Sequence, residues 1–499
     1  MNNIFKKLFI FEMANNHQGD VKLGLKIISE MAKLKRKYQI NCGVKLQLRD
    51  LDSFIHPDYI SRTDVKHIPR FLSTRLSNEK FRILLDAIHA EGMLSIVTPF
   101  DENSVQNSIN LGAKILKVAS CSAKDWPLLE EISKTKRPLI ISTGGCNIED
   151  IDEIYSYFTH KRIDFSLLHC VAQYPANNDS LCLSFIDKLK NRYPEIAIGW
   201  SGHEAPDNYD PIKVAIAKGA EIFERHVGVP TETIQLNAYS MYPQQVDNWL
   251  DTASTTMKIC GNGNQKHISQ EELDSLLSLQ RGVYAKKEIA KGKKIEADDI
   301  FFAMPCLEGQ LQSSDFGKYR AEYFASREYN TNEAIFEECT IQDKIRIIRS
   351  VVHEAKGLLY EANIHIGEDF SVELSHHYGI QQFRSIGAVI INIINRKYCK
   401  KLIIVLPGQL NPTHKHLCKE ETFQLLTGDL TLKLNKQSHC LKPGDKMLVE
   451  PGVFHSFQSN NGAIFEEIST THLRADSIYE DVIINKLDPL ERKTIIDTW

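Results

Sequence analysis

Short apolar runs rich in β-branched residues alternate with amphipathic stretches through residues 1–262. In the amphipathic stretches, such as Val21–Lys37, Glu79–Gly92 and Asp101–Leu111, apolar residues recur every three to four positions, which predicts helices. The apolar runs predict eight strands, at Leu8–Glu12, Gly43–Gln47, Leu94–Thr98, Ile115–Ser120, Leu139–Thr143, Phe165–Cys170, Ala197–Ser201 and Ile222–His226. Strands of this kind followed by helices are typical of a parallel sheet, and eight such units favour an α/β fold, the closed (β/α)8 TIM barrel. Because no GxGxxG motif follows the first strand, a dinucleotide-binding fold is disfavoured.

Nearly every predicted strand ends in polar residues. In a barrel these carboxyl ends converge on one mouth. A single polar residue at a strand end is equally well explained by a satisfied structural hydrogen bond, but the whole set together favours a functional site. Its members are Glu12, Lys45, Gln47, Thr98, Lys117, Ser120, Ser142, Thr143, His169, Ser201, His203, Glu224 and His226.

Two lysines, Lys45 and Lys117, stand among hydroxyl groups in this set. Phosphate and carboxylate groups are bound by such a combination of positive charge and fixed hydrogen-bond donors. The turn Ser142–Gly145 adds backbone N–H groups ahead of a helix, whose N-terminus favours anions. The sequence therefore predicts an anion-binding site whose hydroxyl groups come from Thr98, Ser120, Ser142, Thr143 and Ser201.

Two histidines, His203 and His226, follow the seventh and eighth strands, which are neighbours in a barrel. Both imidazoles can therefore reach one divalent metal ion. A metal held by two histidines keeps open positions and suits a Lewis acid that polarises a carbonyl group. The alternative is that each is a structural histidine.

The rest of the chain changes pattern twice. A short β unit with a Lys/Gly turn begins near Arg281, and a related phrase returns near Ala325, which indicates a small β-rich domain over residues 281–342. Residues 345–499 then form a third domain. After an initial helical segment this domain is β-rich, and its Pro-Gly and Gly-Asp turns are typical of a small β-barrel or jelly roll.

The third domain contains a His-x-His pair followed by a glutamate and, on a later strand, another histidine. Alternate positions on a strand point to the same side, so His414 and His416 face the interior together. With Glu421 and His455 they predict a site of three histidines and one carboxylate, which suits Mn, Fe, Ni or Zn.

Composition limits the remaining possibilities. The formal net charge is −4 and 25% of the residues are charged, without long runs of like charge, so a nucleic-acid partner is not expected. No signal-peptide layout and no apolar run of membrane-spanning length is present, so no membrane association is expected. The 11 cysteines are scattered without a CxxC pair, which favours reduced thiols and a cytoplasmic location.

The barrel region resembles the sialic acid synthase family, which includes legionaminic and pseudaminic acid synthases. The motifs that carry the resemblance occur in family order: FEMANNHQGD, VKLQ, VTPF, LKVAS, ISTGG, HCVAQYP, GWSGH and ERHVG. The resemblance implies condensation of phosphoenolpyruvate with an aldose, a sugar aldehyde, to form a sialic-acid-like nonulosonic acid and phosphate. It also implies a metal, usually manganese, on His203 and His226.

Substrate contacts also follow from the resemblance. Phosphoenolpyruvate is expected among Lys45, Thr98, Lys117, Ser120, Ser142, Thr143 and Ser201. The sugar is expected at Glu12, Gln47 and Tyr174, where Glu12 either handles a proton or holds sugar hydroxyl groups.

Four departures from the family pattern bear on the acceptor sugar. Ser122 stands where members carry a glutamate, Ala172 where many carry asparagine, and Gly202 where N-acetylneuraminate synthases carry aspartate. Residues 281–342 resemble the antifreeze-like SAF domain, which implies a homodimer with this domain swapped over the partner's site. There Met304-Pro305-Cys306 replaces the Arg-Pro-Gly turn that supplies a sugar-binding arginine. An acceptor other than N-acetylmannosamine is therefore expected.

The third domain is similar to cupins of the D-lyxose-isomerase type, which implies either an isomerase or a domain that only binds sugar or stabilises the dimer. Two alternatives for the whole protein stay open. One is a non-catalytic sugar-binding or scaffold protein with a degenerate barrel, and the other is an aldolase-type lyase.

Overall fold

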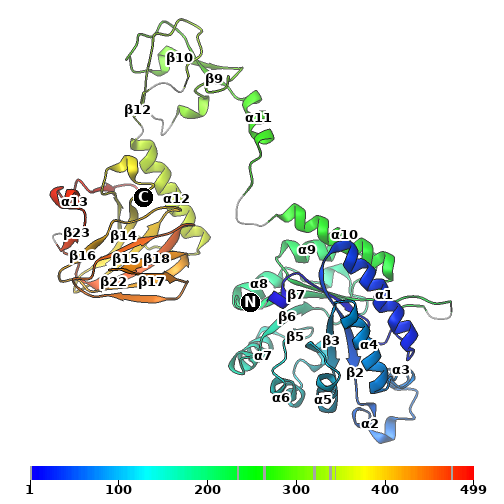
Figure 1. Cartoon of the computed structure of the whole chain (residues 1–499). Coiled ribbons are helices and arrows are strands. Elements are labelled where there is room, and N and C mark those ends of the chain that lie inside the picture. Colours follow the sequence, from blue (N-terminus) through cyan, green and yellow to red (C-terminus); the bar gives the residue numbers. More distant parts are fainter. Residues whose placement is uncertain are drawn as a thin grey trace. The chain divides into compact units, whose positions relative to one another are not determined.

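A computed structural model describes residues 3–232, 235–261, 266–317, 322–336, 340–342, 344–473 and 476–499. The chain divides into two compact units, 1–266 and 267–499 (Figure 1). Within the described residues, no helix has both the length and the apolar character needed to cross a membrane.

The first unit is a closed barrel of eight parallel strands in sequence order, as the apolar runs predict. Glu12 lies in register with Lys45 on one side and His226 on the other, so three predicted site residues share one level of the sheet. The fourth strand ends earlier than predicted, because Ser120 already opens the 3₁₀ turn η3 (Ser120–Ser122). The strands are β1 (Leu8–Glu12), β2 (Asn41–Leu48), β3 (Leu94–Pro99), β4 (Ile115–Val118), β5 (Leu139–Ser142), β6 (Phe165–Cys170), β7 (Ala197–Gly202) and β8 (Ile222–His226).

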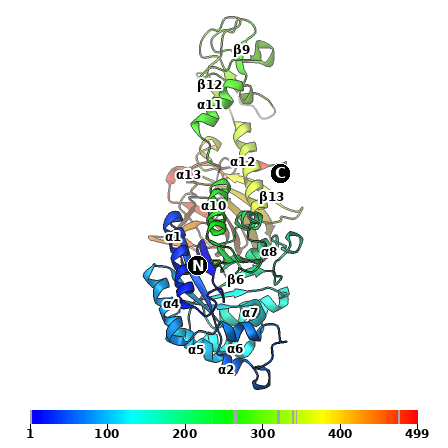
Figure 2. The same ribbon diagram turned by 90° about the vertical axis from the view of Figure 1, so that its right-hand side faces the viewer.

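Helices surround the barrel and bury their apolar stripes against it. Helix α1 (Val21–Tyr38) begins where the Asp20 carboxylate accepts a hydrogen bond from Lys22 N–H. It lies beside α4 (Asn78–Ala90) (Figure 2). The two approach closely because a Cβ atom at Gly24 would lie 2.8 Å from Leu84. The other helices of this unit are α2 (Leu51–Phe54), α3 (Ile68–Ser73), α5 (Glu102–Asn110), α6 (Trp126–Lys134), α7 (Ile148–His160), α8 (Phe185–Arg192), α9 (Asp210–Ala217) and α10 (Pro243–Cys260).

The hydrophobic core of this unit has two layers. One lies between strands and helices, and the other fills the barrel interior below the polar strand ends. Burial of each Leu or Ile side chain contributes roughly 1.5–3 kcal/mol to the free energy of folding. The apolar interior therefore stabilises the barrel independently of the polar residues at its mouth. The interior layer consists of Phe5, Leu8, Ile10, Ile96, Ile115, Ile140, Leu168, Ala197 and Ile222.

The second unit begins with helix α11 (Gln270–Leu279) and a small β-rich region. Strand β9 (Gly282–Ala285) pairs with β10 (Ile300–Ala303), and β11 (Glu322–Phe324) pairs with β12 (Thr340–Gln342). This region has its own core, formed by Val283, Ala285, Ile289, Ile295, Ile300, Leu311, Tyr323, Ala325, Tyr329 and Ile335.

Helix α12 (Lys344–Glu361) leads into strands arranged in two sheets, with the order β20-β17-β22-β15-β14-β13-β24 in one and β19-β18-β21-β16-β23 in the other. A short helix, α13 (Val482–Lys486), lies between the last two strands. The strands are β13 (Ser371–Ser375), β14 (Ala388–Asn395), β15 (Tyr398–Val405), β16 (His414–His416), β17 (Glu421–Gly428), β18 (Leu430–Leu434), β19 (Gln437–Leu441), β20 (Lys446–Val449), β21 (His455–Gln458), β22 (Ala463–Thr470), β23 (Ser477–Tyr479) and β24 (Lys493–Ile496).

Candidate active site and metal centre

Buried lysines and glutamates form an ion-pair cluster at the barrel mouth. Lys45 Nζ lies 2.5 Å from Glu12 Oε2 and 2.8 Å from Glu224 Oε2. Lys117 Nζ donates to Ser142 Oγ at 2.6 Å and lies 3.8 Å from Glu224 Oε1. The structure thus brings together the two lysines that the sequence assigns to anion binding, and every side chain of the cluster is buried.

Glu224 is the centre of this cluster, whereas the sequence pattern predicts it only as a polar strand end. It also accepts a hydrogen bond from Ser201 Oγ at 2.8 Å. Burial alone would raise the pKa of Glu224, but Lys117 and Lys45 hold it well below its usual range. Its position two residues before His226 is the signal that could have identified it, since alternate residues of a strand point to the same side.

Burial changes the pKa of Lys45. Full burial lowers the pKa of Lys45 to about 7, although Glu224 acts in the opposite direction. An anionic substrate arriving beside this lysine would favour its charged form. The cluster can therefore bind an anion and also exchange a proton near neutral pH.

The predicted hydroxyl groups fall into three classes. Thr98 Oγ1 is buried without a partner among the described residues, and is thus available to a ligand. Ser142 and Ser201 are joined to the lysine–glutamate cluster. Ser120 Oγ instead accepts from Gly144 N–H at 3.1 Å, and Thr143 Oγ1 donates to the Leu168 carbonyl at 3.1 Å. These last two hydroxyl groups stabilise the turn after β5.

His203 and His226 lie side by side, with ring centroids 5.4 Å apart. His203 Nδ1 is 3.1 Å from the Val171 carbonyl, which orients the ring and leaves Nε2 free to ligate. The buried Nδ1 of His226 has no partner among the described residues. Burial lowers the pKa of His203 to about 4 and that of His226 well below its usual range, so both rings are neutral at pH 7, as metal binding requires. The pair therefore fits a divalent metal.

Of the three predicted sugar contacts, Glu12 belongs to the lysine–glutamate cluster, whereas Gln47 and Tyr174 do not. Tyr174 is 53% exposed and its ring centroid lies 4.3 Å from that of His203. Tyr239, which no sequence motif indicates, also belongs to this group, with its ring centroid 5.0 Å from that of His226. Gln47 Oε1 accepts a hydrogen bond from Arg49 Nη1 at 3.1 Å. The two tyrosines and Gln47 thus lie outside the lysine–glutamate cluster.

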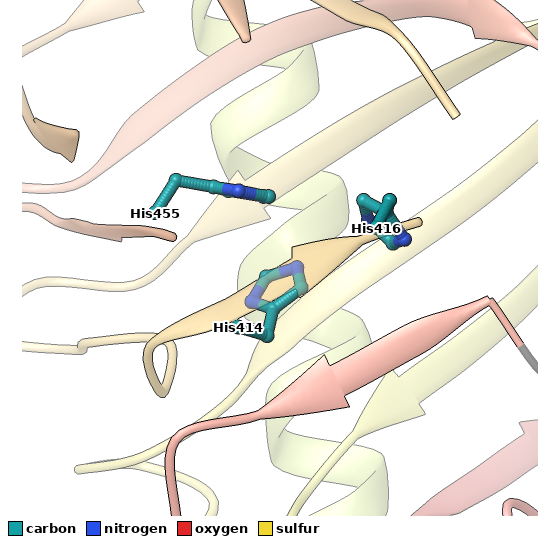
Figure 3. A group of neighbouring side chains, drawn as sticks. All are labelled: His414, His416 and His455. Carbon is teal, nitrogen blue, oxygen red and sulfur yellow. The ribbon is translucent and has the colours of Figure 1, made fainter. Parts of the chain in front are cut away.

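A second candidate centre lies in the C-terminal sheets. His414 and His416 on β16 and His455 on β21 bring one nitrogen each to within 4.8 Å of one another (Figure 3). His414 Nδ1 is 2.9 Å from the Pro412 carbonyl, and His455 Nδ1 is 3.1 Å from the Val453 carbonyl. These hydrogen bonds fix both rings and leave their Nε2 atoms for a metal.

Glu421, the predicted fourth ligand, lies beside this triad. Its carboxylate oxygens are 3.3 Å from His416 Nε2 and 3.2 Å from His455 Nε2. Lys419 Nζ, 2.6 Å from Glu421 Oε1, also contacts Glu467. Lys419, Glu421 and Glu467 line a cavity of about 330 Å³ together with His414 and His416, so a ligand can reach these two histidines of the triad.

Comparisons with known proteins agree on the barrel. The NeuB family model matches residues 34–265. A solved structure described as spore coat polysaccharide biosynthesis protein E from Chromobacterium violaceum is 41% identical. The similarity covers 68% of this chain and 100% of the Chromobacterium violaceum chain, with a TM-score of 0.65.

Two curated enzymes are also similar. The N,N'-diacetyllegionaminic acid synthase of Campylobacter jejuni is 28% identical over 66% of this chain and 99% of its own length. The N-acetylneuraminate-9-phosphate synthase of Drosophila melanogaster is 27% identical over 62% of this chain and 89% of its own.

Proposed function

Because the barrel region of this chain belongs to the NeuB family, we propose that the protein condenses phosphoenolpyruvate with an aldose. The products are a nonulosonic or related 3-deoxy-2-keto sugar acid and inorganic phosphate. The observation that carries the proposal is the buried cluster of Lys45, Lys117 and Glu224 beside His203 and His226. It supports an anionic substrate and a polarised carbonyl group within one mouth.

The residues present account for the steps of such a condensation. Lys45 and Lys117 bind the phosphate and carboxylate of phosphoenolpyruvate, with Thr98 as a further donor. C3 of phosphoenolpyruvate attacks the aldehyde carbon, whose oxygen becomes a hydroxyl group. Water adds at C2, and phosphate leaves. A divalent metal on His203 and His226 would supply Lewis-acid polarisation of the aldehyde oxygen.

Glutamates of the cluster would handle the protons of this reaction. Glu12 accepts a hydrogen bond from Ala14 N–H at 2.6 Å and pairs with Lys45, so its carboxylate is fixed next to the anion site. Glu224 is equally fixed by Ser201. Either carboxylate could take the proton of the attacking water, or hold a sugar hydroxyl group.

Phosphate release from phosphoenolpyruvate is the test of this function. We expect release only when an aldose is added, loss of release after chelation, and recovery with manganese. Release from phosphoenolpyruvate without any aldose, or no release across a broad panel of aldoses, would contradict the condensation. Cleavage of sugar acids to pyruvate without use of phosphoenolpyruvate would support an aldolase. Sugar binding without turnover would support a scaffold.

N-acetylmannosamine is expected to be a poor acceptor beside another aldose. Ser122 is buried and Met304 is exposed, and neither offers the charged sugar contact that sialic acid synthases carry there. A site without such a partner loses the strong discrimination that a buried hydrogen bond provides. The measurement is kcat/KM across an aldose panel, and a highest value for N-acetylmannosamine would show that these positions do not set the preference.

For the second unit we propose a supporting role in the same reaction. Residues 281–342 would act as an antifreeze-like SAF domain over the partner's barrel in a homodimer. Residues 345–499 would act as a cupin that interconverts a ketose and the aldose acceptor. The cavity beside His414, His416 and His455 supports this second function, because a metal there could bind the carbonyl and hydroxyl oxygens between which the proton moves.

A further inference from the structure

A small cavity lies beside Gln47 at the barrel mouth. Its volume is about 30 Å³, which has room for about two water-sized groups. It is lined by Asn15, His17, Gln47, Arg49, Thr74 and Arg75 together with apolar side chains, and no carboxylate lines it. A cavity with two guanidinium groups and no acidic side chain favours an anionic occupant.

Arg49 is held rigidly in the wall of this cavity. Its guanidinium lies 3.5 Å from the ring centroid of Phe100 and 4.2 Å from that of Phe71. Phe71 belongs to helix α3, in the long connection between β2 and β3. Stacking of this kind fixes the plane of the guanidinium while leaving its edge free for hydrogen bonds.

Among the residues that the structure describes, Arg49 has no carboxylate counter-ion. Within the described parts of the chain, no carboxylate oxygen lies within 4 Å of its nitrogens, and its buried Nε has no hydrogen-bond partner. Asp101, a carboxylate that acts on Arg49 only from a distance, is itself bonded to Ser104 and to the backbone N–H of Asp50. Burial lowers the pKa of Arg49 only to about 10, so the group stays charged at neutral pH.

Arg75, the other guanidinium of the cavity, is already neutralised. It pairs with the exposed Asp52 at 2.9 and 2.5 Å. His17 is uncharged at pH 7, since burial, with a contribution from Arg70, lowers its pKa to about 4. Of the cations that line this cavity, Arg49 is therefore the one without an ion-pair partner among the described residues, and Arg49 Nη1 donates a hydrogen bond to Gln47.

We propose that Arg49 binds a compact oxyanion, a carboxylate or a phosphate, carried by the acceptor sugar at the end remote from its aldehyde. The proposal rests on the proposed condensation, in which Gln47 contacts the acceptor. A buried charged donor without a partner is costly. A ligand that supplies two oxygens to the Arg49 guanidinium would form these missing hydrogen bonds and would therefore be bound favourably. The preferred acceptor is then an acidic aldose rather than a neutral one.

The test is equilibrium binding to the full chain, measured by calorimetry with two matched pairs of sugars. One pair is glucuronate and glucose, and the other is mannose 6-phosphate and mannose. We expect the wild type to bind at least one acidic member about 10- to 100-fold more tightly than its neutral parent. Arg49→Gln should remove this difference, whereas Arg62→Gln should keep it. Arg62 is an exposed arginine paired with Asp64 in the same connection.

The outcomes separate the rival explanations. Equal or undetectable binding of all four sugars by the wild type would overturn the proposal. So would an Arg49→Gln variant that keeps the preference and only unfolds at a lower temperature, because Arg49 would then serve packing alone. A raised KM for phosphoenolpyruvate with unchanged sugar preference would assign Arg49 to the other substrate. If Arg49→Gln does not fold, Arg49→Lys should retain charge but weaken the preference. The binding result is independent of phosphate release, so failure of the condensation is recognised separately.

Discussion

Replacing Lys117 with alanine is expected to lower kcat/KM for phosphoenolpyruvate roughly 30- to 900-fold, which corresponds to about 2–4 kcal/mol. The side chain is 1% exposed and bonded to Ser142, so its charge is fixed where the anion would bind. Its loss also leaves Glu224 with one lysine fewer, which adds repulsion toward the substrate. Steady-state phosphate release at varied phosphoenolpyruvate concentration measures the effect.

Lys114→Ala is the matched control for this substitution. Lys114 directly precedes the same strand but is exposed, so its removal should change kcat/KM little. Lys117→Met keeps the length of the side chain and guards against a packing defect. An unchanged KM for phosphoenolpyruvate in both Lys117 variants, with melting temperatures near that of the wild type, would show that this lysine does not bind the anion.

The double substitution His414→Ala with His416→Ala is expected to remove about one metal ion per chain and to abolish activity that starts from a ketose. Loss of two of three histidine ligands leaves too few donors for a divalent ion. Condensation of a supplied aldose should continue, because the barrel holds its own histidine pair. Metal content by elemental analysis and phosphate release with each ketose–aldose pair are the two measurements.

His439→Ala controls for loss of any histidine, since His439 lies on β19 and does not line the cavity beside the triad. It should retain both metal content and ketose use. If the double variant uses every ketose as well as the wild type does, the domain is not an isomerase and only binds sugar or stabilises the dimer. An unchanged metal content in the double variant would show that these histidines do not bind a metal ion.

The barrel strands were largely predictable because buried parallel strands are nearly continuous apolar runs. The end of β4 was not, since Ser120 continues the extended pattern in sequence but forms a 3₁₀ turn. Polar groups at strand ends identified the mouth. The role of Glu224 depends on distances to Lys45 and Lys117 across other strands, and those distances follow from barrel closure rather than from spacing along the chain.

The histidine triad of the C-terminal sheets was predictable because His-x-His places two rings on one face of a strand. Arg49 was not identified, because its surroundings come from Phe71 and Phe100, which follow it by many residues. From the sequence, a charged residue directly after a strand is ordinarily predicted to be exposed to solvent. Only the tertiary packing shows that Arg49 is enclosed by aromatic rings and has no carboxylate counter-ion within the described part of the chain.

The alignment of Glu12 with Lys45 and His226 constrains how such a protein can diversify over generations. Deleting one residue within β1 would turn Glu12 from the mouth toward the helices, since successive side chains alternate between the two faces. Glu12 would then no longer lie beside Lys45 of the predicted anion site and His226 of the predicted metal site. An insertion in a connection such as residues 49–77 would leave this register intact, so acceptor preference could change there while the positions of Glu12, Lys45 and His226 stay the same.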